Sequence, residues 1–164
     1  CFTTPLHRHL PNYCSYFPDT DKYFGSSGSF YDLFPSSGSF VAHPQSADVH
    51  TLITMYTHIA NIMQQGLNAL SFIVCVRHNP AFNCVREIPG LGPYVRHAEL
   101  LHRNQHLFEV GRRHKVYQKT IPLGLQLWSS THDTVVYWIQ NAAGAQTWPI
   151  GEKSVRQLLD SFTP

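Results

Sequence analysis

Histidine is the side chain best suited to chemistry in this sequence, where it occurs eleven times. Its ring transfers protons near neutral pH and is a common metal ligand. A helical zinc site needs two histidines four residues apart and a carboxylate. His102 and His106 have that spacing, but they lie in a basic segment without an acidic partner. We therefore expect structural or solvent-exposed histidines and no metal site.

Two short polar segments follow predicted strands and are candidate catalytic segments. Residues 43–46 (His-Pro-Gln-Ser) follow residues 38–42, and residues 79–82 (Asn-Pro-Ala-Phe) follow the apolar run 70–76. In open α/β sheets, ligands bind outside the carboxyl ends of the strands. A four-residue pattern is easily met by chance, so we interpret the second segment as the start of an ordinary loop.

The elements that would position these segments form a strand-helix-strand unit. Apolar residues recur at steps of three or four over residues 47–65, which predicts a helix capped by Ser46 and ended by Gly66. The strands are Gly38–Ala42 and Leu70–Val76. The second is a continuous apolar run, typical of a strand covered on both faces. The unit predicts a right-handed crossover and a parallel, doubly covered sheet.

Later segments alternate between both kinds of element. Residues 94–101 favour a helix, 115–119 and 125–129 favour short strands, Thr134–Gln140 favours a strand, and Glu152–Phe162 favours an amphipathic helix. The sequence therefore predicts an α/β domain.

The first forty residues are rich in turn-forming residues and in aromatic rings. Gly, Ser and Pro predict turns, and the burial of large rings would hold these loops in place. The expected anchors are Tyr13, Tyr16, Phe17, Tyr23, Phe24, Phe30, Tyr31 and Phe34.

Composition limits the class of protein. With 164 residues, 43% of them hydrophobic, the chain predicts one domain over residues 1–164. Only 13% of residues are charged, which favours a neutral surface that lies against a protein partner. No apolar run is long enough to span a bilayer. Cysteines without C-x-x-C spacing favour a reducing, intracellular compartment. Because the chain starts at Cys1 and not at Met, we expect a segment of a longer protein, and we expect it to be the C-terminal part.

Basic residues are concentrated in the middle of the chain. Residues 77–119 hold eight Lys or Arg against three Glu, and such an excess can meet a phosphate backbone. A solvated loop and helix face is the alternative. The candidate RNA-binding residues are Arg77, Arg86, Arg112, Arg113 and Lys115.

Several segments in fixed order resemble one known family. They are residues 12–26 (Asn-Tyr-Cys-Ser-Tyr-Phe-Pro-Asp-Thr-Asp-Lys-Tyr-Phe-Gly-Ser), the run Gly38-Ser39-Phe40-x-Ala42-x-Pro44, Leu70–Val74 and, more weakly, 135–141. Together they resemble the methyltransferase domain of the phosphorylated-CTD-interacting factor family, the cap-specific adenosine N6-methyltransferases. The resemblance covers nearly the whole chain.

The resemblance implies a Rossmann-like class I methyltransferase fold, with a mostly parallel sheet, an antiparallel edge pair and possible incompleteness at the N-terminus. It also implies S-adenosylmethionine as cofactor, N6 of the 2′-O-methyladenosine beside an mRNA cap as substrate, and a nuclear location. The family's preceding helical domain and tryptophan-paired WW module are not matched.

Two groups of residues are candidates for the cofactor. The resemblance places Phe2, Thr4 and Pro5 near the end of the first strand of the family's fold, beside the cofactor. Acidic groups often hold nucleotide hydroxyls, so the second group is Asp19, Asp21 and Asp32. A turn-forming role is an equally good interpretation of these aspartates.

The catalytic tetrapeptide of the family is degenerate here. N6-adenine methyltransferases carry Asn/Asp-Pro-Pro-Phe/Tyr at this strand end, because an amide oxygen and a carbonyl accept the amine's two N–H bonds while the ring stacks on the base. The corresponding residues are His43, Pro44, Gln45 and Ser46, of which only Pro44 is retained. The family register places residues 79–82 one strand too late.

Three hypotheses follow. The first is a degenerate methyltransferase-like domain, a pseudoenzyme, that binds RNA or a protein. The second is an active S-adenosylmethionine-dependent adenine N6-methyltransferase that uses His43 or Asn79. The third is a structural subunit of a ribonucleoprotein assembly that binds no cofactor.

Overall fold

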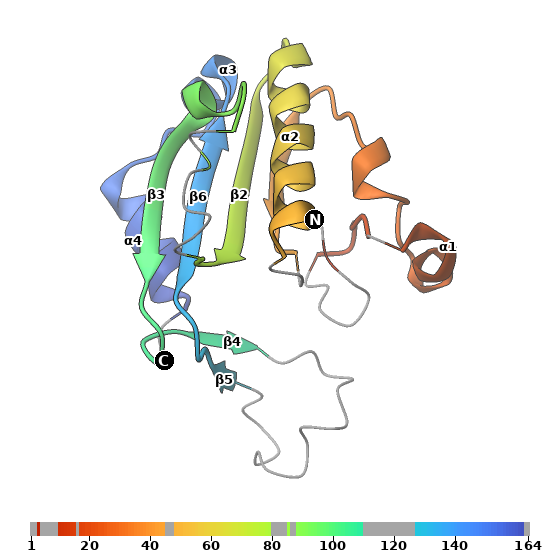
Figure 1. Ribbon diagram of the computed structural model, residues 1–164. Coiled ribbons are helices and arrows are strands. Elements are labelled where there is room, and N and C mark those ends of the chain that lie inside the picture. The colour runs from red at the N-terminus through yellow and green to blue at the C-terminus, as the bar shows by residue number, and fades with distance from the viewer. Residues whose placement is uncertain are drawn as a thin grey trace.

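The main element of the fold is a four-stranded sheet. The structure is a computed structural model, and it describes residues 3, 10–15, 17–44, 48–79, 85, 88–109 and 127–162. In these residues the strands are ordered β1 (Gly38–Ala42), β2 (Leu70–Arg77), β6 (Thr134–Gln140) and β3 (Val95–Leu101), as Figure 1 shows.

The direction of β6 determines how the sheet is paired. β1 and β2 are parallel, whereas β6 is antiparallel to both β2 and β3. β1, β2 and β3 therefore point the same way, with β6 as the opposed strand. The sheet was predicted to be mostly parallel. This prediction is wrong, because β6 lies between β2 and β3 and makes antiparallel pairs with both. An antiparallel pair does lie at one edge, but it joins β6 to β3, whose residues were predicted as a helix.

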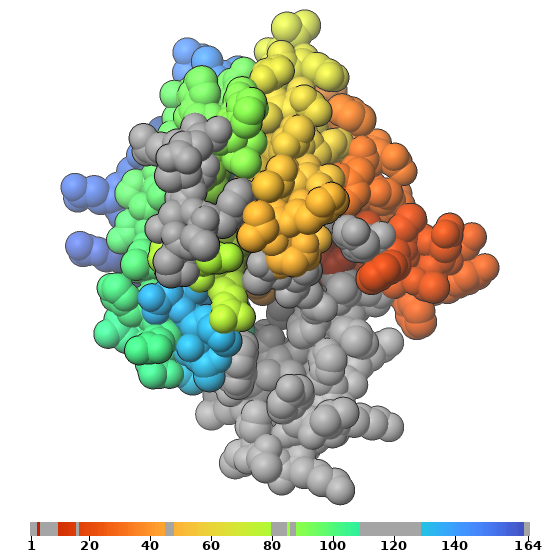
Figure 2. All heavy atoms as spheres, in the orientation of Figure 1, coloured from red at the N-terminus to blue at the C-terminus, as the bar shows by residue number. Residues whose placement is uncertain are grey.

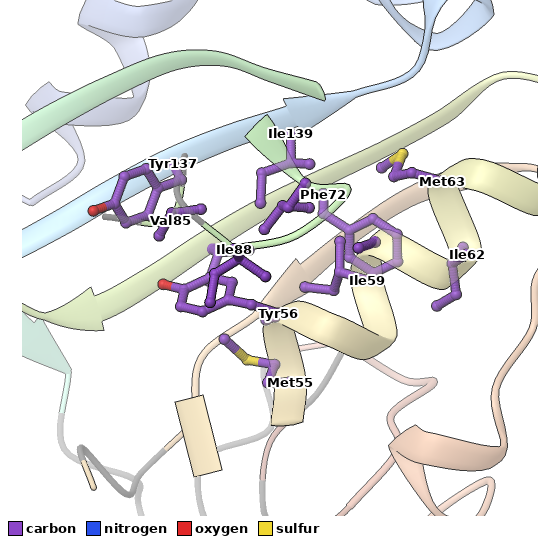
Figure 3. Packing of buried hydrophobic residues seen from close by; sticks show 14 of the residues in the cluster. Met55, Tyr56, Ile59, Ile62, Met63, Phe72, Val85, Ile88, Tyr137 and Ile139 are labelled. Carbon is purple, nitrogen blue, oxygen red and sulfur yellow. The ribbon is translucent and has the colours of Figure 1, made fainter. Parts of the chain in front are cut away.

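Helix α2 (Val49–Gln65) covers one face of the sheet. It begins at Asp48, whose side chain accepts a 2.9 Å hydrogen bond from the Thr51 N–H. The predicted cap, Ser46, is therefore wrong, because Asp48 caps the helix two residues later. The core between α2 and the sheet includes Met55, Tyr56, Ile59, Ile62, Met63, Phe72, Tyr137 and Ile139 (Figure 3).

Helix α4 (Glu152–Asp160) covers the opposite face. Val155 and Leu158 pack against a second buried group of Cys75, Val136 and Trp138. Neighbouring residues of β2 point to opposite faces, and nearly all of them are buried. The apolar run was thus correctly interpreted as a strand covered on both sides.

The segment 94–101, predicted as a helix, forms strand β3. Burial alternates along it, from buried Val95 to exposed Arg96 and onward with a period of two. Its Ala-Glu-Leu-Leu end has good local helix propensity, but backbone pairing with β6 overrides that preference. A register shift between Val95 and His97 marks the start of this pairing.

Two short strands form a separate ribbon. β4 (Leu107–Glu109) pairs antiparallel with β5 (Leu127–Ser129). β5 confirms the strand predicted at 125–129, whereas β4 was not predicted. The strand predicted at 115–119 lies outside the described residues.

The N-terminal segment contains short helical turns held by buried rings. These turns are α1 (Pro18–Asp21), η1 (Lys22–Phe24) and η2 (Phe30–Asp32). Tyr13 and Phe30 are 1% and 2% exposed and are anchors as predicted. Tyr23 is 81% exposed, so the prediction that every ring here is buried is wrong. The described residues contain no helix long and apolar enough to cross a membrane.

Candidate functional site

The carboxyl ends of β1, β2 and β3 meet at one edge of the sheet, which we call the carboxyl edge. Ala42 pairs with Val74, so His43 leaves β1 level with Cys75 of the neighbouring strand. Figure 1 shows this edge at the bottom of the sheet, beside the β4–β5 ribbon. Open α/β sheets bind their ligands at such an edge.

His43 contacts an aromatic ring that the sequence did not reveal. The rings of His43 and Phe108 are stacked, with centroids 5.5 Å apart and planes 18° from parallel. Phe108 belongs to β4, and both side chains are half-buried. Pro44 is also half-buried, whereas Gln45 and Ser46 lie outside the described residues. An aromatic side chain is thus present beside the first residue of the segment 43–46.

Two further rings pack against Phe108. His106 and Phe162 lie 5.3 Å and 5.8 Å from it, both close to perpendicular. The Leu107 N–H donates a 2.7 Å hydrogen bond to the Phe162 carbonyl. The C-terminal residues therefore fix β4 in position and, with it, the ring that faces His43.

His106 is a buried structural histidine, only 1% exposed. Its Nδ1 lies 2.8 Å from the His102 carbonyl and its Nε2 lies 2.9 Å from the Thr134 hydroxyl. A carbonyl can only accept, so Nδ1 carries a proton and donates to the His102 carbonyl. Among the described residues, no three His, Cys, Asp or Glu side chains are grouped to hold a metal ion.

Asn79, from the second candidate catalytic segment (residues 79–82), lies farther along the same edge. β2 continues to Arg77, three residues beyond the partner of Ala42. The next N–H, that of His78, donates to the Asp133 carbonyl at 2.8 Å, so the chain here still runs beside β6. Asn79 is half-buried, and residues 80–82 lie outside the described residues.

The predicted carboxylates belong to the N-terminal helical turns and not to the strands of the sheet. Asp19 and Asp21 belong to α1, which protrudes on the side of the molecule away from β2 and β3 (Figures 1 and 2). The Asp21 carbonyl accepts from the Ser26 N–H at 3.2 Å, which is a turn contact. Asp32 ends η2, beside His58 of α2. Phe2, Thr4 and Pro5 lie outside the described residues.

Basic side chains do lie at this edge. Arg77 ends β2, and Arg103 follows β3; both are exposed. The Arg103 N–H donates a 2.7 Å hydrogen bond to Asp133 Oδ1, and this bond, with the nearby charges of His102, Arg103 and His78, lowers the pKa of Asp133. The remaining predicted RNA-binding residues, Arg86, Arg112, Arg113 and Lys115, lie outside the described residues.

Comparison with protein families gives a match over residues 1–111 to the family described as Phosphorylated CTD interacting factor 1 WW domain. The chain's tryptophans are Trp128, Trp138 and Trp148, and all three lie outside the matched residues. Because a WW module is built around tryptophans, the match indicates relationship to that family's proteins and not a WW fold.

Curated proteins from mouse and human are similar to the chain. Each is named mRNA (2′-O-methyladenosine-N(6)-)-methyltransferase and is 29% identical over 167 residues, which is 99% of this chain and 22% of the relative. The chain therefore spans about a fifth of the length of the curated relatives that it matches.

Proposed function

Because the chain belongs to the phosphorylated CTD interacting factor 1 family and is related to RNA methyltransferases, we propose that it is a methyltransferase-like domain that binds adenosine-containing mRNA without methylating it. The binding site in this proposal is the carboxyl edge of β1, β2 and β3. β1, β2 and β3 run in one direction, and β6 runs in the opposite direction between β2 and β3. This arrangement supports the proposal that the chain forms the later half of a class I methyltransferase sheet.

The stacking of His43 on Phe108 is the observation that carries this proposal. Methyl transfer to an exocyclic amine needs an acceptor that turns the nitrogen lone pair toward the methyl group. In N6-adenine methyltransferases this acceptor is the side-chain oxygen of an Asn or Asp residue. A histidine ring packed flat against phenylalanine places its nitrogens in another position. With His43 in place of Asn or Asp, the site still binds an adenine base but does not activate its amine for methyl transfer.

S-adenosylmethionine is assigned no step in this proposal. Its predicted acidic ligands, Asp19, Asp21 and Asp32, belong to α1 and η2, and their role toward the cofactor stays a prediction. Whether the chain binds the cofactor is decided by calorimetric titration, and the proposal requires only that RNA binds. A protein partner remains part of the same proposal, because only 13% of the residues are charged.

A methyl-transfer assay tests the proposal directly. The substrate is capped RNA that begins with 2′-O-methyladenosine, the methyl donor carries tritium, and RNA binding is measured in parallel by fluorescence anisotropy. We expect binding without transfer. Robust transfer that disappears in His43→Ala would overturn the proposal. Absence of RNA binding would instead favour a structural subunit.

An active enzyme is the second candidate, favoured by the printed activity of the relatives and by the position of Asn79 at the same edge. Asn79 offers the amide oxygen that His43 lacks. In this case, transfer would be lost in Asn79→Ala and retained in His43→Ala. The pair of variants thus identifies which strand end performs the chemistry.

A further inference from the structure

Three neighbouring strands end or begin at one level of the carboxyl edge. Arg77, the last residue of β2, pairs with Thr134, the first residue of β6, and Leu101, the last residue of β3, pairs with it from the other side. The pairing extends one residue further, because the His78 N–H donates to the Asp133 carbonyl at 2.8 Å. The residues that follow β2 and β3 therefore lie on either side of Asp133.

Asp133 holds the turn that follows β3. Its Oδ1 accepts a 2.7 Å hydrogen bond from the Arg103 N–H, and the Asn104 N–H donates to the Ser130 carbonyl at 2.9 Å. Asn104 has a φ of 63°, a left-handed conformation that asparagine adopts more readily than most residues. These bonds fix the place at which the Arg103 side chain leaves the backbone.

Positive groups surround the Asp133 carboxylate. The hydrogen bond from the Arg103 N–H is the main cause of the lowered pKa of this carboxyl, and the nearby charges of His102, Arg103 and His78 lower it further. These side chains follow two different strands, β2 and β3, and the pairing of both strands with β6 brings them together. Figure 2 shows the ends of β2 and β3 and the start of β6 side by side. We call His78, His102, Arg103 and Asp133 the Asp133 cluster.

The side chains around Asp133 have no ion-pair or hydrogen-bond partner among the described residues. Arg103 and His102 are exposed, and within the described part of the chain neither side chain forms an ion pair or a hydrogen bond. Nδ1 of half-buried His78 also has no hydrogen-bond partner there. Their donors therefore remain available to an anion, and a guanidinium group matches the oxygens of a phosphate.

We propose that the Asp133 cluster binds a backbone phosphate of single-stranded RNA, with Arg103, His102 and His78 as donors to the phosphate oxygens. The inference rests on the proposed function and deepens it, because it assigns a phosphate contact to the end of β3, where none was predicted. Contacts to phosphates fix the position of a nucleic acid without reading its sequence. Asp133 is a positioning residue, since it holds the turn of Arg103 and does not touch the phosphate.

The charge of the Asp133 cluster depends on pH. The charged and titratable side chains on the elements that meet at this place are those of Arg77, His78, His102, Arg103, His106, His132 and Asp133. Histidine is the side chain that gains a positive charge between about pH 8 and pH 5, whereas the lowered pKa of Asp133 keeps its carboxylate ionised over this range. Acidification therefore adds only positive charge, and RNA affinity should rise as the pH falls.

Fluorescence anisotropy with a short single-stranded RNA tests the contact of Arg103. Arg103→Gln should weaken binding by roughly 2- to 5-fold, as for one exposed charged contact, and should reduce the slope of log affinity against log salt by about 0.7. Arg156→Gln is the matched control, because it removes the same charge from an exposed position of α4 and should change neither quantity. Unchanged affinity and slope in Arg103→Gln would overturn the inference.

Two substitutions of Asp133 separate its charge from its hydrogen bond. Asp133→Asn keeps an oxygen for the Arg103 N–H but removes a negative charge beside the phosphate, so RNA should bind more tightly, by roughly 2- to 5-fold. Asp133→Ala also removes the acceptor, and its affinity should fall below that of Asp133→Asn. Circular dichroism of both variants establishes that the domain is folded. Weaker or unchanged binding in Asp133→Asn would overturn the inference, because a purely structural aspartate gives no gain.

The pH dependence tests the two histidines. Affinity of the unaltered chain should rise between pH 8 and pH 6, and the double substitution His78→Gln with His102→Gln should flatten this rise. Arg156→Gln should keep the rise, because arginine stays charged throughout this range. A rise of the same size in the double variant would overturn the role of the histidines in the site.

Competition identifies the kind of anion that the Asp133 cluster binds. Unlabelled RNA should displace the labelled RNA more effectively than polyglutamate of the same total charge does. Equal displacement by polyglutamate would assign the cluster to an acidic protein and overturn the inference. Failure of the unaltered chain to bind any single-stranded RNA at low salt would overturn the proposed function as a whole. RNA binding that is indifferent to both Arg103→Gln and Asp133→Asn would overturn only the phosphate site.

Discussion

Asn141 and Leu70 are joined by two hydrogen bonds, although they lie 71 residues apart in the sequence. The Asn141 N–H donates to the Leu70 carbonyl at 3.2 Å, and the Leu70 N–H donates to Asn141 Oδ1 at 3.1 Å. Leu70 begins β2, and Asn141 directly follows β6. This pair closes the centre of the sheet at the end opposite the candidate site.

The Asn141 amide also makes three other hydrogen bonds. Oδ1 accepts from the Gly144 N–H at 2.7 Å and so caps α3 (Ala142–Thr147). Nδ2 donates to the carbonyls of Gly66 and Asn68 at 3.2 Å and 2.7 Å. One buried side chain therefore connects β2, the end of α2 and the start of α3.

Asn141→Ala should lower the free energy of unfolding by about 2–4 kcal/mol, the sum of a lost helix cap and buried backbone groups left without a partner. Urea denaturation measures this change. Asn68→Ala is the matched control, because this side chain is exposed and should cost less than about 0.5 kcal/mol. Equal effects of the two substitutions would show that the Asn141 amide is not a structural centre.

Gly144→Ala should destabilise the domain although alanine favours helices by about 1 kcal/mol over glycine. An added Cβ would lie 2.1 Å from the Leu70 carbonyl oxygen and 2.8 Å from its carbon. These are backbone atoms of β2, so the strand or α3 must move, and we expect a net loss of about 2 kcal/mol in thermal or urea denaturation.

Gly151→Ala is the control for that substitution. A Cβ at Gly151 meets no atom within 4 Å, and its N-cap position makes alanine only slightly unfavourable, within about 1 kcal/mol. A Gly144→Ala variant as stable as Gly151→Ala would mean that the close approach of α3 to β2 is relaxed in solution.

The sequence correctly predicted the strands and helices that have a clear hydrophobic pattern within their own residues. β1, β2 and β6 are apolar or β-branched runs, and α2 and α4 have clear helical periodicity. β3 was mistaken for a helix, because its local propensity conflicts with the pairing that β6 provides. β4 has three residues, which is too short for any period to show.

The candidate site was predicted only in part for the same reason. His43 could be placed at a strand end, because the strand precedes it directly. Phe108 lies 65 residues later, and its contact with His43 depends on Phe162 and His106, which are themselves distant. No local pattern encodes such a contact, so only the folded chain reveals it.

His58 should make the domain sensitive to acid. His58 is 7% exposed, and its ring lies at a steep angle to those of Phe30, Tyr31 and Phe34, with Nε2 3.1 Å from the Leu33 carbonyl. Burial lowers the pKa of His58 below its ordinary value of 6.5, and this effect outweighs the opposing hydrogen bonds and the charge of Asp32.

The sign follows from the neutral ring being favoured in the folded chain. This contribution to stability is present above about pH 6.5 and is lost as the pH falls through the lower pKa of the folded state. Unfolding free energies measured between neutral and mildly acidic pH should fall less steeply in His58→Gln than in the unaltered chain. His50→Gln, at an exposed position of the same helix, should keep the original slope. A slope unaffected by His58→Gln would contradict the prediction.

Cys75 should make the domain less stable at alkaline pH. Its thiol is 7% exposed on the face covered by α4, and burial raises the pKa of Cys75 from 9.0 to about 12. The folded state keeps the neutral thiol, so its contribution to stability is complete below about pH 9 and is lost as the pH rises toward 12.

Urea denaturation between pH 8 and pH 11 measures that loss, with a slope of at most about 1.4 kcal/mol per pH unit from this one group. Cys75→Ala should remove this part of the slope, while the raised pKa values of Tyr56 and Cys14 keep the remainder. Alkylation followed by peptide mass spectrometry gives a second measurement, because a buried neutral thiol reacts only when the chain opens. Labelling of Cys75 should therefore proceed at the rate at which α4 separates from the sheet. Rapid labelling of the folded chain at neutral pH would show that α4 does not cover this face of β2.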